Sequence, residues 1–154
     1  MIGRQRYQII GYMLGVLLAS VAPAISEEAR FRAGAVVVDV SPTQFPVLIN
    51  GSFRSREADS INTPVSARAV VVDDGNERLA IVVVDSCMIP RFVLDDAKKL
   101  AAARTQISPD RMLISATHPH SAPSCMGALG TKADAAYVSL LRERLATAIA
   151  EAEK

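Results

Sequence analysis

The chain has 154 residues, half of them hydrophobic, and a formal net charge of +1 at pH 7. This length allows one globular domain with a modest core. Such a balanced charge does not favour a nucleic acid or an acidic surface as a partner, and with 5% aromatic residues and no Trp the chain offers no stacking platform for bases.

The N-terminus has the pattern of an export signal. Two arginines within the first six residues precede an apolar stretch at 9–21, and Ala22-Pro23-Ala24 matches the small-x-small pattern of a cleavage site. The apolar stretch is short for a transmembrane span. We therefore expect residues 1–24 to be a cleaved signal peptide, in preference to a retained anchor, and residues 25–154 to be exported to the periplasm or the cell exterior.

The first strand-like segment is A-V-V-V-D-V at 35–40, which ends where Ser41-Pro42 stops pairing. Residues 43–66, with two prolines and a glycine, are predicted to form a long irregular loop of the kind that is often functional or mobile. Within it, Asn50-Gly51-Ser52 matches a glycosylation sequon, although such a stretch is as easily a turn.

Two further β-branched runs, A-R-A-V-V-V-D at 67–73 and L-A-I-V-V-V-D at 79–85, flank the glycine-containing segment 74–78. This arrangement predicts an antiparallel hairpin. Because the second run is nearly all apolar, we expect it to be central in its sheet and covered on both faces.

Beyond Pro90 the apolar spacing changes to three and four residues, which predicts a helix that ends before Ser108-Pro109. A short apolar strand at 112–116 follows, so the order strand, helix, strand predicts a right-handed crossover between parallel strands. Residues 133–154 form a second amphipathic pattern, whose apolar face combines Tyr137, Leu140, Leu141, Leu145, Ala148 and Ile149.

These elements predict an α/β fold. We expect a mixed sheet with a β-hairpin and a βαβ unit, flanked by helices. No glycine cap or proline closes the last helical segment. The sequence is therefore interpreted as an incomplete portion of a larger layered α/β domain, truncated within a helix.

The residues of chemical interest follow two of the predicted strands. Asp85 and Cys87 lie at the end of one, and both histidines of the chain, His118 and His120, lie just after the other. In open α/β sheets the ligand site lies at the carboxyl ends of the strands. If these strands are neighbours, the four residues and Cys125 gather at one rim.

The spacing H-P-H has two interpretations, a metal site and an ordinary polar loop. In extended backbone, side chains two residues apart face the same way, so His118 and His120 could approach one cation. Pro119 steers the residue before it away from the helical region, which favours that extended conformation. The alternative, two histidines hydrogen-bonded to backbone in a polar loop, stays open on spacing alone.

A catalytic zinc site needs about three protein ligands and a water molecule. A site made wholly from this chain would thus need Asp85, Cys87 or Cys125 beside the histidines. Other roles are open for each: Asp85 could orient His118 from behind the metal or cap a loop. The two cysteines could form a disulfide in an exported protein or remain free, partly buried thiols.

Four segments carry a family resemblance: F-R-A-G-A-V-V-V-D-V-S-P at 31–42, N-T-P-V-S-A-R-A-V-V-V-D-D-G at 62–75, I-V-V-V-D at 81–85 and R-M-L-I-S-A-T-H-P-H-S-A-P at 111–123. In this order they resemble the N-terminal part of neutral, non-lysosomal ceramidases. The last is the most specific, since the family pattern is Ser/Gly-x-Thr-His-Thr-His-Ser-Gly-Pro. This chain departs from that pattern at Pro119 and Ala122, and again after Pro123.

The resemblance implies an exported, zinc-dependent amidase that splits an N-acyl sphingoid base, a ceramide, into a fatty acid and an amine. It assigns Zn²⁺ to His118 and contact with the substrate carbonyl or developing oxyanion to His120. It places a second zinc histidine, Glu and Tyr ligands and an active-site Ser beyond the residues of this chain. We therefore expect the chain alone to bind zinc weakly and to hydrolyse nothing.

Three hypotheses follow. The first is a fragment of a ceramidase-like zinc amidohydrolase with a lipid-like amide substrate, a class of substrate that allows peripheral contact with a membrane. The second is an exported hydrolase of the same fold that acts on a different amide or ester. The third is a non-enzymatic, exported α/β binding module, which would hold no metal.

Overall fold

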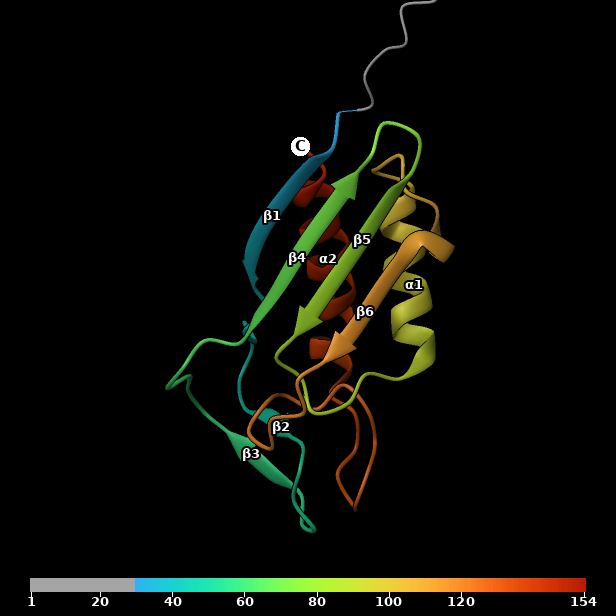
Figure 1. Ribbon diagram of the computed structural model, residues 1–154. Helices are drawn as coiled ribbons and strands as arrows, with labels where there is room; N and C mark the ends of the chain where they lie inside the picture. The colour runs from blue at the N-terminus through green and yellow to red at the C-terminus, as the bar shows by residue number, and fades with distance from the viewer. Residues whose placement is uncertain (1–29) are drawn as a thin grey trace, which may run out of the picture.

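Four strands form one mixed sheet in the computed structural model, which describes residues 30–154 (Figure 1). Their order is β1 (Arg32–Asp39), β4 (Ser66–Asp73), β5 (Arg78–Val84) and β6 (Met112–Ala116). The pairs β1/β4 and β4/β5 are antiparallel, whereas β5/β6 is parallel. The predicted hairpin and βαβ unit are thereby confirmed. The predicted signal peptide, residues 1–24, lies outside the described residues.

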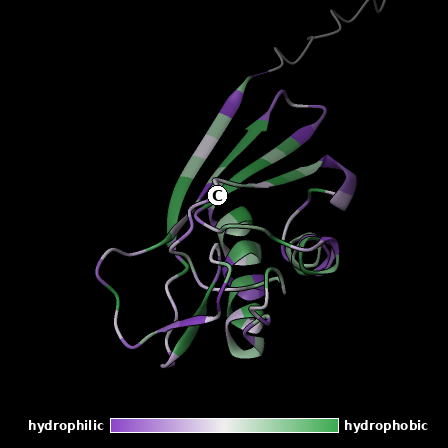
Figure 2. Ribbon diagram, turned by 90° about the horizontal axis from the view of Figure 1, so that it is seen from below, coloured by the Kyte–Doolittle hydropathy of each residue, from purple (hydrophilic) through white to green (hydrophobic). Residues whose placement is uncertain are grey.

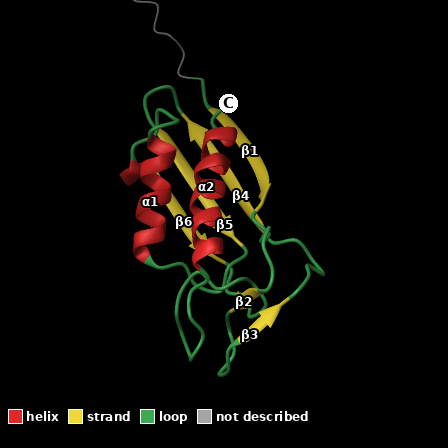
Figure 3. Ribbon diagram, turned by 180° about the vertical axis from the view of Figure 1, so that it is seen from behind, coloured by secondary structure: helices red, strands yellow, loops and turns green. Residues whose placement is uncertain are grey.

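Two helices lie side by side on one face of this sheet (Figures 2 and 3). The first, α1 (Arg91–Ala102), together with the short 3₁₀ turn η1 (Pro109–Arg111), connects β5 to β6, and α2 (Ala135–Ala152) is the last element. Both helices lie within the segments where the apolar spacing of three and four residues predicted them. Neither has the length and apolar character that a bilayer-crossing helix requires, a finding that concerns residues 30–154 only.

The core lies between the helices and the sheet face that they cover. Alternate residues of each strand point into it, as the period of two requires; on β5 these are Ala80, Val82 and Val84, all buried. The helices contribute residues at intervals of four, such as Leu141, Leu145 and Ile149 on α2. The apolar run of β5 thus supplies one half of its residues to this core.

The other half of β5 faces away from both helices. Ile81 is 45% exposed and is aligned with Val70 of β4 and Leu113 of β6, which are 41% and 59% exposed. The prediction that this strand is central is confirmed, but the prediction that it is covered on both faces is wrong among the described residues. Both helices pack on the same side, so an apolar run here marks one buried face and one open face.

A small second sheet lies in the segment that was predicted to be irregular. It pairs β2 (Val47–Ile49) with β3 (Arg56–Ala58) and sits beyond the end of the main sheet where β5 and β6 terminate (Figure 1). These three-residue strands are too short to give a periodic pattern. Their placement brings the segment after β6 into contact with β2, through the bridge between Ile49 and Pro123.

Candidate metal centre

The site begins where two parallel strands end side by side. Val84 of β5 is paired with Ala116 of β6, and the ladder continues past both strands. The Thr117 N–H donates to the Val84 carbonyl at 3.0 Å, and the His118 N–H donates to the Ser86 carbonyl at 3.0 Å. The loop after β5 and the loop after β6 are therefore joined by backbone bonds, and the two strands are the neighbours that a shared rim requires.

His118 has a left-handed backbone with φ of 66°, so the predicted extended conformation is wrong at this residue. Its ring Nδ1 lies 2.6 Å from the carbonyl oxygen of Cys87. A carbonyl oxygen only accepts hydrogen bonds, so Nδ1 carries the proton and Nε2 of a neutral ring has a free lone pair. Non-glycine residues rarely adopt this conformation, and it recurs at functional sites.

His120 stands edge-on to His118, with ring centroids 5.0 Å apart and an interplanar angle of 74°. Arg56 of β3 donates to the His120 carbonyl oxygen at 2.8 Å. Gly51, with φ of 91°, lies against the same residue, and a Cβ at position 51 would fall 2.5 Å from the His120 Cβ. Arg56 of β3 and Gly51 of the β2–β3 connection therefore hold His120 in position.

The residue pattern alone did not indicate that Gly51 and Arg56 contribute to the site. The local signal was the stretch Asn50-Gly51-Ser52, interpreted as a sequon or a turn, near which the family resemblance places backbone on the substrate side. Asn50 is only 1% exposed, and its side-chain amide donates to the Met126 carbonyl at 2.9 Å. It is thus a buried structural residue, and the sequon interpretation does not agree with its burial.

Cys87 is the third member of the site. It is 2% exposed, and burial raises the pKa of its thiol. Its Sγ lies 3.9 Å from His118 Nδ1. One donor atom each from Cys87, His118 and His120 can be chosen so that all three lie within 4.8 Å of one another. Thiolate sulfur and imidazole nitrogen are the ligands that zinc takes in proteins.

Asp85 binds partners other than the two histidines. Its carboxylate accepts bonds from the Arg68 guanidinium and the Ser66 N–H, all at 3.0 Å, and from the Thr117 hydroxyl at 3.3 Å. Burial by itself would raise the pKa of Asp85, but these bonds outweigh it and hold the pKa below the usual value. The predicted role behind His118 is replaced by the alternative, a loop-capping carboxylate, because the His118 ring uses the Cys87 carbonyl.

Cys125 is buried on a separate set of contacts. Its Sγ donates to the Met88 carbonyl at 2.8 Å and lies 3.4 Å from the Ser86 Oγ. Cys87 and Cys125 are both free thiols. The disulfide weighed from the sequence is therefore absent between these two residues, and the alternative of two free thiols describes them.

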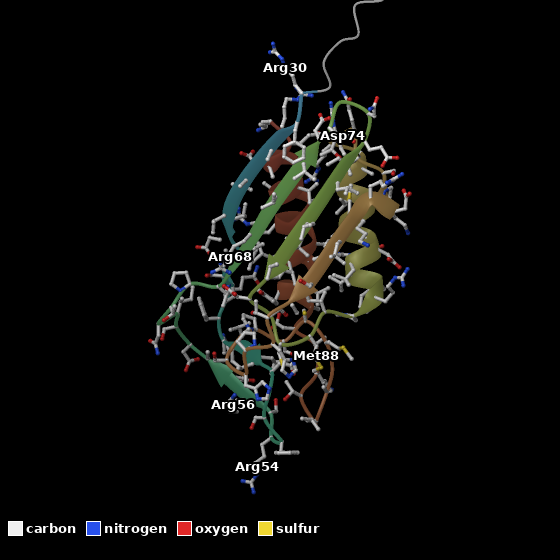
Figure 4. The ribbon with its side chains drawn as sticks, in the orientation of Figure 1. Arg30, Arg54, Arg56, Arg68, Asp74 and Met88 are labelled. Carbon is white, nitrogen blue, oxygen red and sulfur yellow. The ribbon has the colours of Figure 1, made fainter. Side chains whose placement is uncertain are left out.

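A cavity of about 440 Å³ lies beside His120, within the usual size range of small-molecule pockets. Its walls come from β2, from β3, from segments 41–42 and 60–65, and from two residues of the segment that follows His120; neither histidine nor Cys87 lines it. Arg56 lies at this end of the molecule, as does Met88 (Figure 4). The lining combines apolar and polar residues, among them Val47, Ile49, Arg56, Ile61, Ser121 and Pro123.

A solved structure with a similar fold is the neutral ceramidase from Pseudomonas aeruginosa, which matches 82% of this chain with a TM-score of 0.70 and 19% sequence identity. The fold is ceramidase-like. A ceramidase complexed with C2 also matches, over 79% of this chain, with a TM-score of 0.60 and 20% identity. The ceramidase-like chain covers 22% and 21% of these proteins, about a fifth of their length. No family model and no curated protein matches the sequence.

Proposed function

We propose that this ceramidase-like chain carries part of a zinc-dependent amidohydrolase site whose substrate is an N-acyl sphingoid base. The observation that carries the proposal is the clustering of His118, His120 and Cys87 at the carboxyl ends of two parallel strands. The cavity beside His120 supports it. The ceramidase-like fold supports the class of substrate.

The donor set of the site fits zinc. Imidazole nitrogen and thiolate sulfur are its usual ligands in proteins. The hydrogen bond from His118 Nδ1 to the Cys87 carbonyl is the kind of contact that fixes the tautomer of a zinc-binding histidine. When bound, zinc would supply a Lewis acid that polarises an amide carbonyl and makes water more acidic.

The two histidines have different tasks in this proposal. His118 holds the metal through Nε2, since Nδ1 is already occupied. His120 stands beside it and donates a ring N–H to the carbonyl oxygen of the amide, where negative charge develops during hydrolysis. Apolar cavity residues such as Val47 and Ile61 would contact the hydrocarbon part of the substrate, and Arg56 would contact its polar part.

Zinc binding tests the metal assignment. We expect His118→Ala to lose zinc in equilibrium dialysis of the 154-residue chain, because the proposed ligand is removed while the fold remains. Circular dichroism checks that the variant is folded. Zinc that stays bound with unchanged affinity in His118→Ala contradicts the assignment.

Binding of a fluorescent short-chain N-acylsphingosine to the zinc-loaded chain tests the substrate class. His120→Ala should weaken binding about tenfold, the value of one hydrogen bond, and should keep its zinc. Arg54→Ala, which lies outside the cavity lining, is the control. No turnover is expected, because the resemblance places the remaining catalytic groups beyond this chain.

The outcomes separate the three hypotheses. Zinc without N-acylsphingosine binding would favour a same-fold hydrolase for another amide or ester. A folded chain that takes up no metal would favour the non-enzymatic binding module.

A further inference from the structure

Two loops project from the end of the molecule that carries the candidate metal centre (Figures 1 and 3). One joins β2 to β3 and exposes Phe53 to 87%, and the other lies between β6 and α2 and exposes Leu129 to 57%. A Cβ on Gly130 would lie 4.0 Å from the Phe53 carbonyl oxygen, so the loops are neighbours. Two large apolar residues are thus exposed on adjacent loops.

Leu129 occupies a position that its residue type does not favour. Ala128 and Thr131 exchange two backbone hydrogen bonds of 3.0 Å, and both residues between them have positive φ, 50° at Leu129 and 81° at Gly130. Two-residue hairpin turns with positive φ at both positions strongly prefer Asn, Asp or Gly there. A leucine that is both strained and exposed contributes little to the core, which indicates a role outside it.

The charges of the two loops have one sign. Residues 50–55 contain Arg54 and residues 126–133 contain Lys132, and neither range contains Asp or Glu. Both cations are exposed, and the Arg54 side chain extends away from the body of the molecule (Figure 4). Exposed apolar side chains next to cations are typical of surfaces that lie on anionic lipid, where the apolar groups enter the acyl boundary and the cations meet the headgroups.

We propose that these two loop tips, Phe53 with Arg54 and Leu129 with Lys132, bind the surface of an anionic lipid bilayer. The inference goes beyond the proposed function, because it requires neither zinc nor amide hydrolysis. It specifies the surface of this chain that meets the membrane.

The position of the tips suits a site for a lipid-like amide. Phe53 follows Gly51 by two residues, at most about 7 Å of chain, and Gly51 lies against His120. At the base of the loops the Asn50 amide donates to the Met126 carbonyl at 2.9 Å. A bilayer bound at the tips would therefore lie next to the candidate metal centre, and a lipid would reach the site without crossing bulk water.

The competing explanation is that protein covers the tips, either a second copy of this chain or the remainder of a longer ceramidase-like protein. The open face of the sheet, with Val70, Ile81 and Leu113, is a continuous surface over three strands and suits such a partner. The tips are instead small, they project from the molecule, and each has a cation beside its apolar residue. These features favour lipid over protein.

The chain contains no Trp, so single tryptophans report where a bilayer lies. We expect the emission of Phe53→Trp and Leu129→Trp to shift to the blue when vesicles of phosphatidylcholine and phosphatidylserine are added to the 154-residue chain, and to be quenched by brominated acyl chains. Leu113→Trp, on the open sheet face, is the matched control, since Leu113 is 59% exposed and Leu129 57%. Its emission should neither shift nor be quenched.

Substitution of the cations tests the charge of the tips, with Phe53→Trp as the reporter. Arg54→Ala and Lys132→Ala should each weaken binding to these vesicles about fivefold. Lys99→Ala, which removes an exposed cation on α1, should leave it unchanged. Short-chain N-acylsphingosine in solution needs no bilayer, so Arg54→Ala should still bind it.

Leu129→Asn separates a role at the membrane from a role in the fold. Asn suits the turn better than Leu, so we expect a free energy of unfolding that is unchanged or higher in urea titrations. The variant should nevertheless bind the vesicles at least tenfold more weakly, because it loses the insertion of a leucine side chain.

Three results would overturn the inference and leave the proposed zinc site standing. The first is emission of Phe53→Trp and Leu129→Trp that stays unquenched on vesicles, and the second is Leu129→Asn that binds vesicles as the parent chain does. The third is a dimer in sedimentation that Leu129→Asn dissociates, since a second copy would then cover the tips. A chain that inserts its tips and takes up no zinc would overturn the proposed function alone.

Discussion

Two residues with positive φ, His118 at 66° and Gly51 at 91°, meet at the candidate metal centre through His120. A non-glycine residue in this region costs about 1–3 kcal/mol and persists only where its surroundings hold it. Around His118 the holding contacts are the backbone bond to Ser86 and the ring bond to Cys87. At Gly51, by contrast, glycine itself permits both the conformation and the close approach of His120.

Gly51→Ala tests this packing. A Cβ at position 51 would lie 2.5 Å from the His120 Cβ, so we expect a loss of about 1–3 kcal/mol in the free energy of unfolding and weaker binding of N-acylsphingosine. Gly127→Ala is the control, because the nearest atom to its added Cβ, the Thr131 carbonyl oxygen, is at an ordinary 3.6 Å. Equal stability of the two variants in urea titrations would argue against tight packing of Gly51 on His120.

Among the elements, the start of α2 joins the core to the site. Asp134 caps the helix by accepting from the Tyr137 N–H at 3.0 Å, and its other oxygen accepts from the Leu48 N–H of β2 at 3.3 Å. Its own N–H donates to the Ser124 carbonyl at 2.8 Å. One residue therefore links α2, β2 and the segment that follows the histidines.

Asp134→Ala should lower the free energy of unfolding by about 0.5–2 kcal/mol, the usual cost of losing a helix cap. Asp134→Asn keeps an acceptor for the Tyr137 N–H, so it should retain most of the stability. Thermal melts followed by circular dichroism measure both. A loss in Asp134→Asn as large as that in Asp134→Ala would show that the charge of Asp134 or its bond from the Leu48 N–H, and not the helix cap, carries the effect.

For the whole molecule, the main asymmetry is between the two faces of the sheet. One face packs against α1 and α2, and the other presents the aligned residues Val70, Ile81 and Leu113. Exposed apolar residues that lie together can bind other apolar surfaces. Neighbouring residues of β5 thus differ in environment: Ile81 lies on the exposed face of the sheet and Val82 on the buried face.

Paired substitutions on β5 test this asymmetry. Ile81→Thr should change stability by less than about 0.5 kcal/mol, as surface substitutions do, and should reduce the fluorescence of a bound hydrophobic dye. Val82→Thr, one residue along and fully buried, should cost about 1–3 kcal/mol because it buries an unpaired hydroxyl. A larger stability loss in Ile81→Thr than in Val82→Thr would reverse the assignment of the faces.

The elements were predictable because their signals are local. The β-branched run of β5 and the apolar spacing of α2 lie within single segments, and the short strand at 112–116 coincides with β6. The prediction failed where the local signal has two explanations. An apolar run is compatible with one covered face or two, and the strands β2 and β3 are too short to produce a period.

The sequence by itself determined that a cysteine follows one strand and that two histidines follow another, since the positions of the strands and the spacing of the residues follow from side-chain pattern. Only the tertiary structure decided that Cys87, and not Asp85 or Cys125, shares the site with His118. The reason is physical: the direction of each side chain at the rim is set by hydrogen bonds between loops about thirty residues apart in the chain, such as that from His118 to Ser86. No local pattern encodes such bonds.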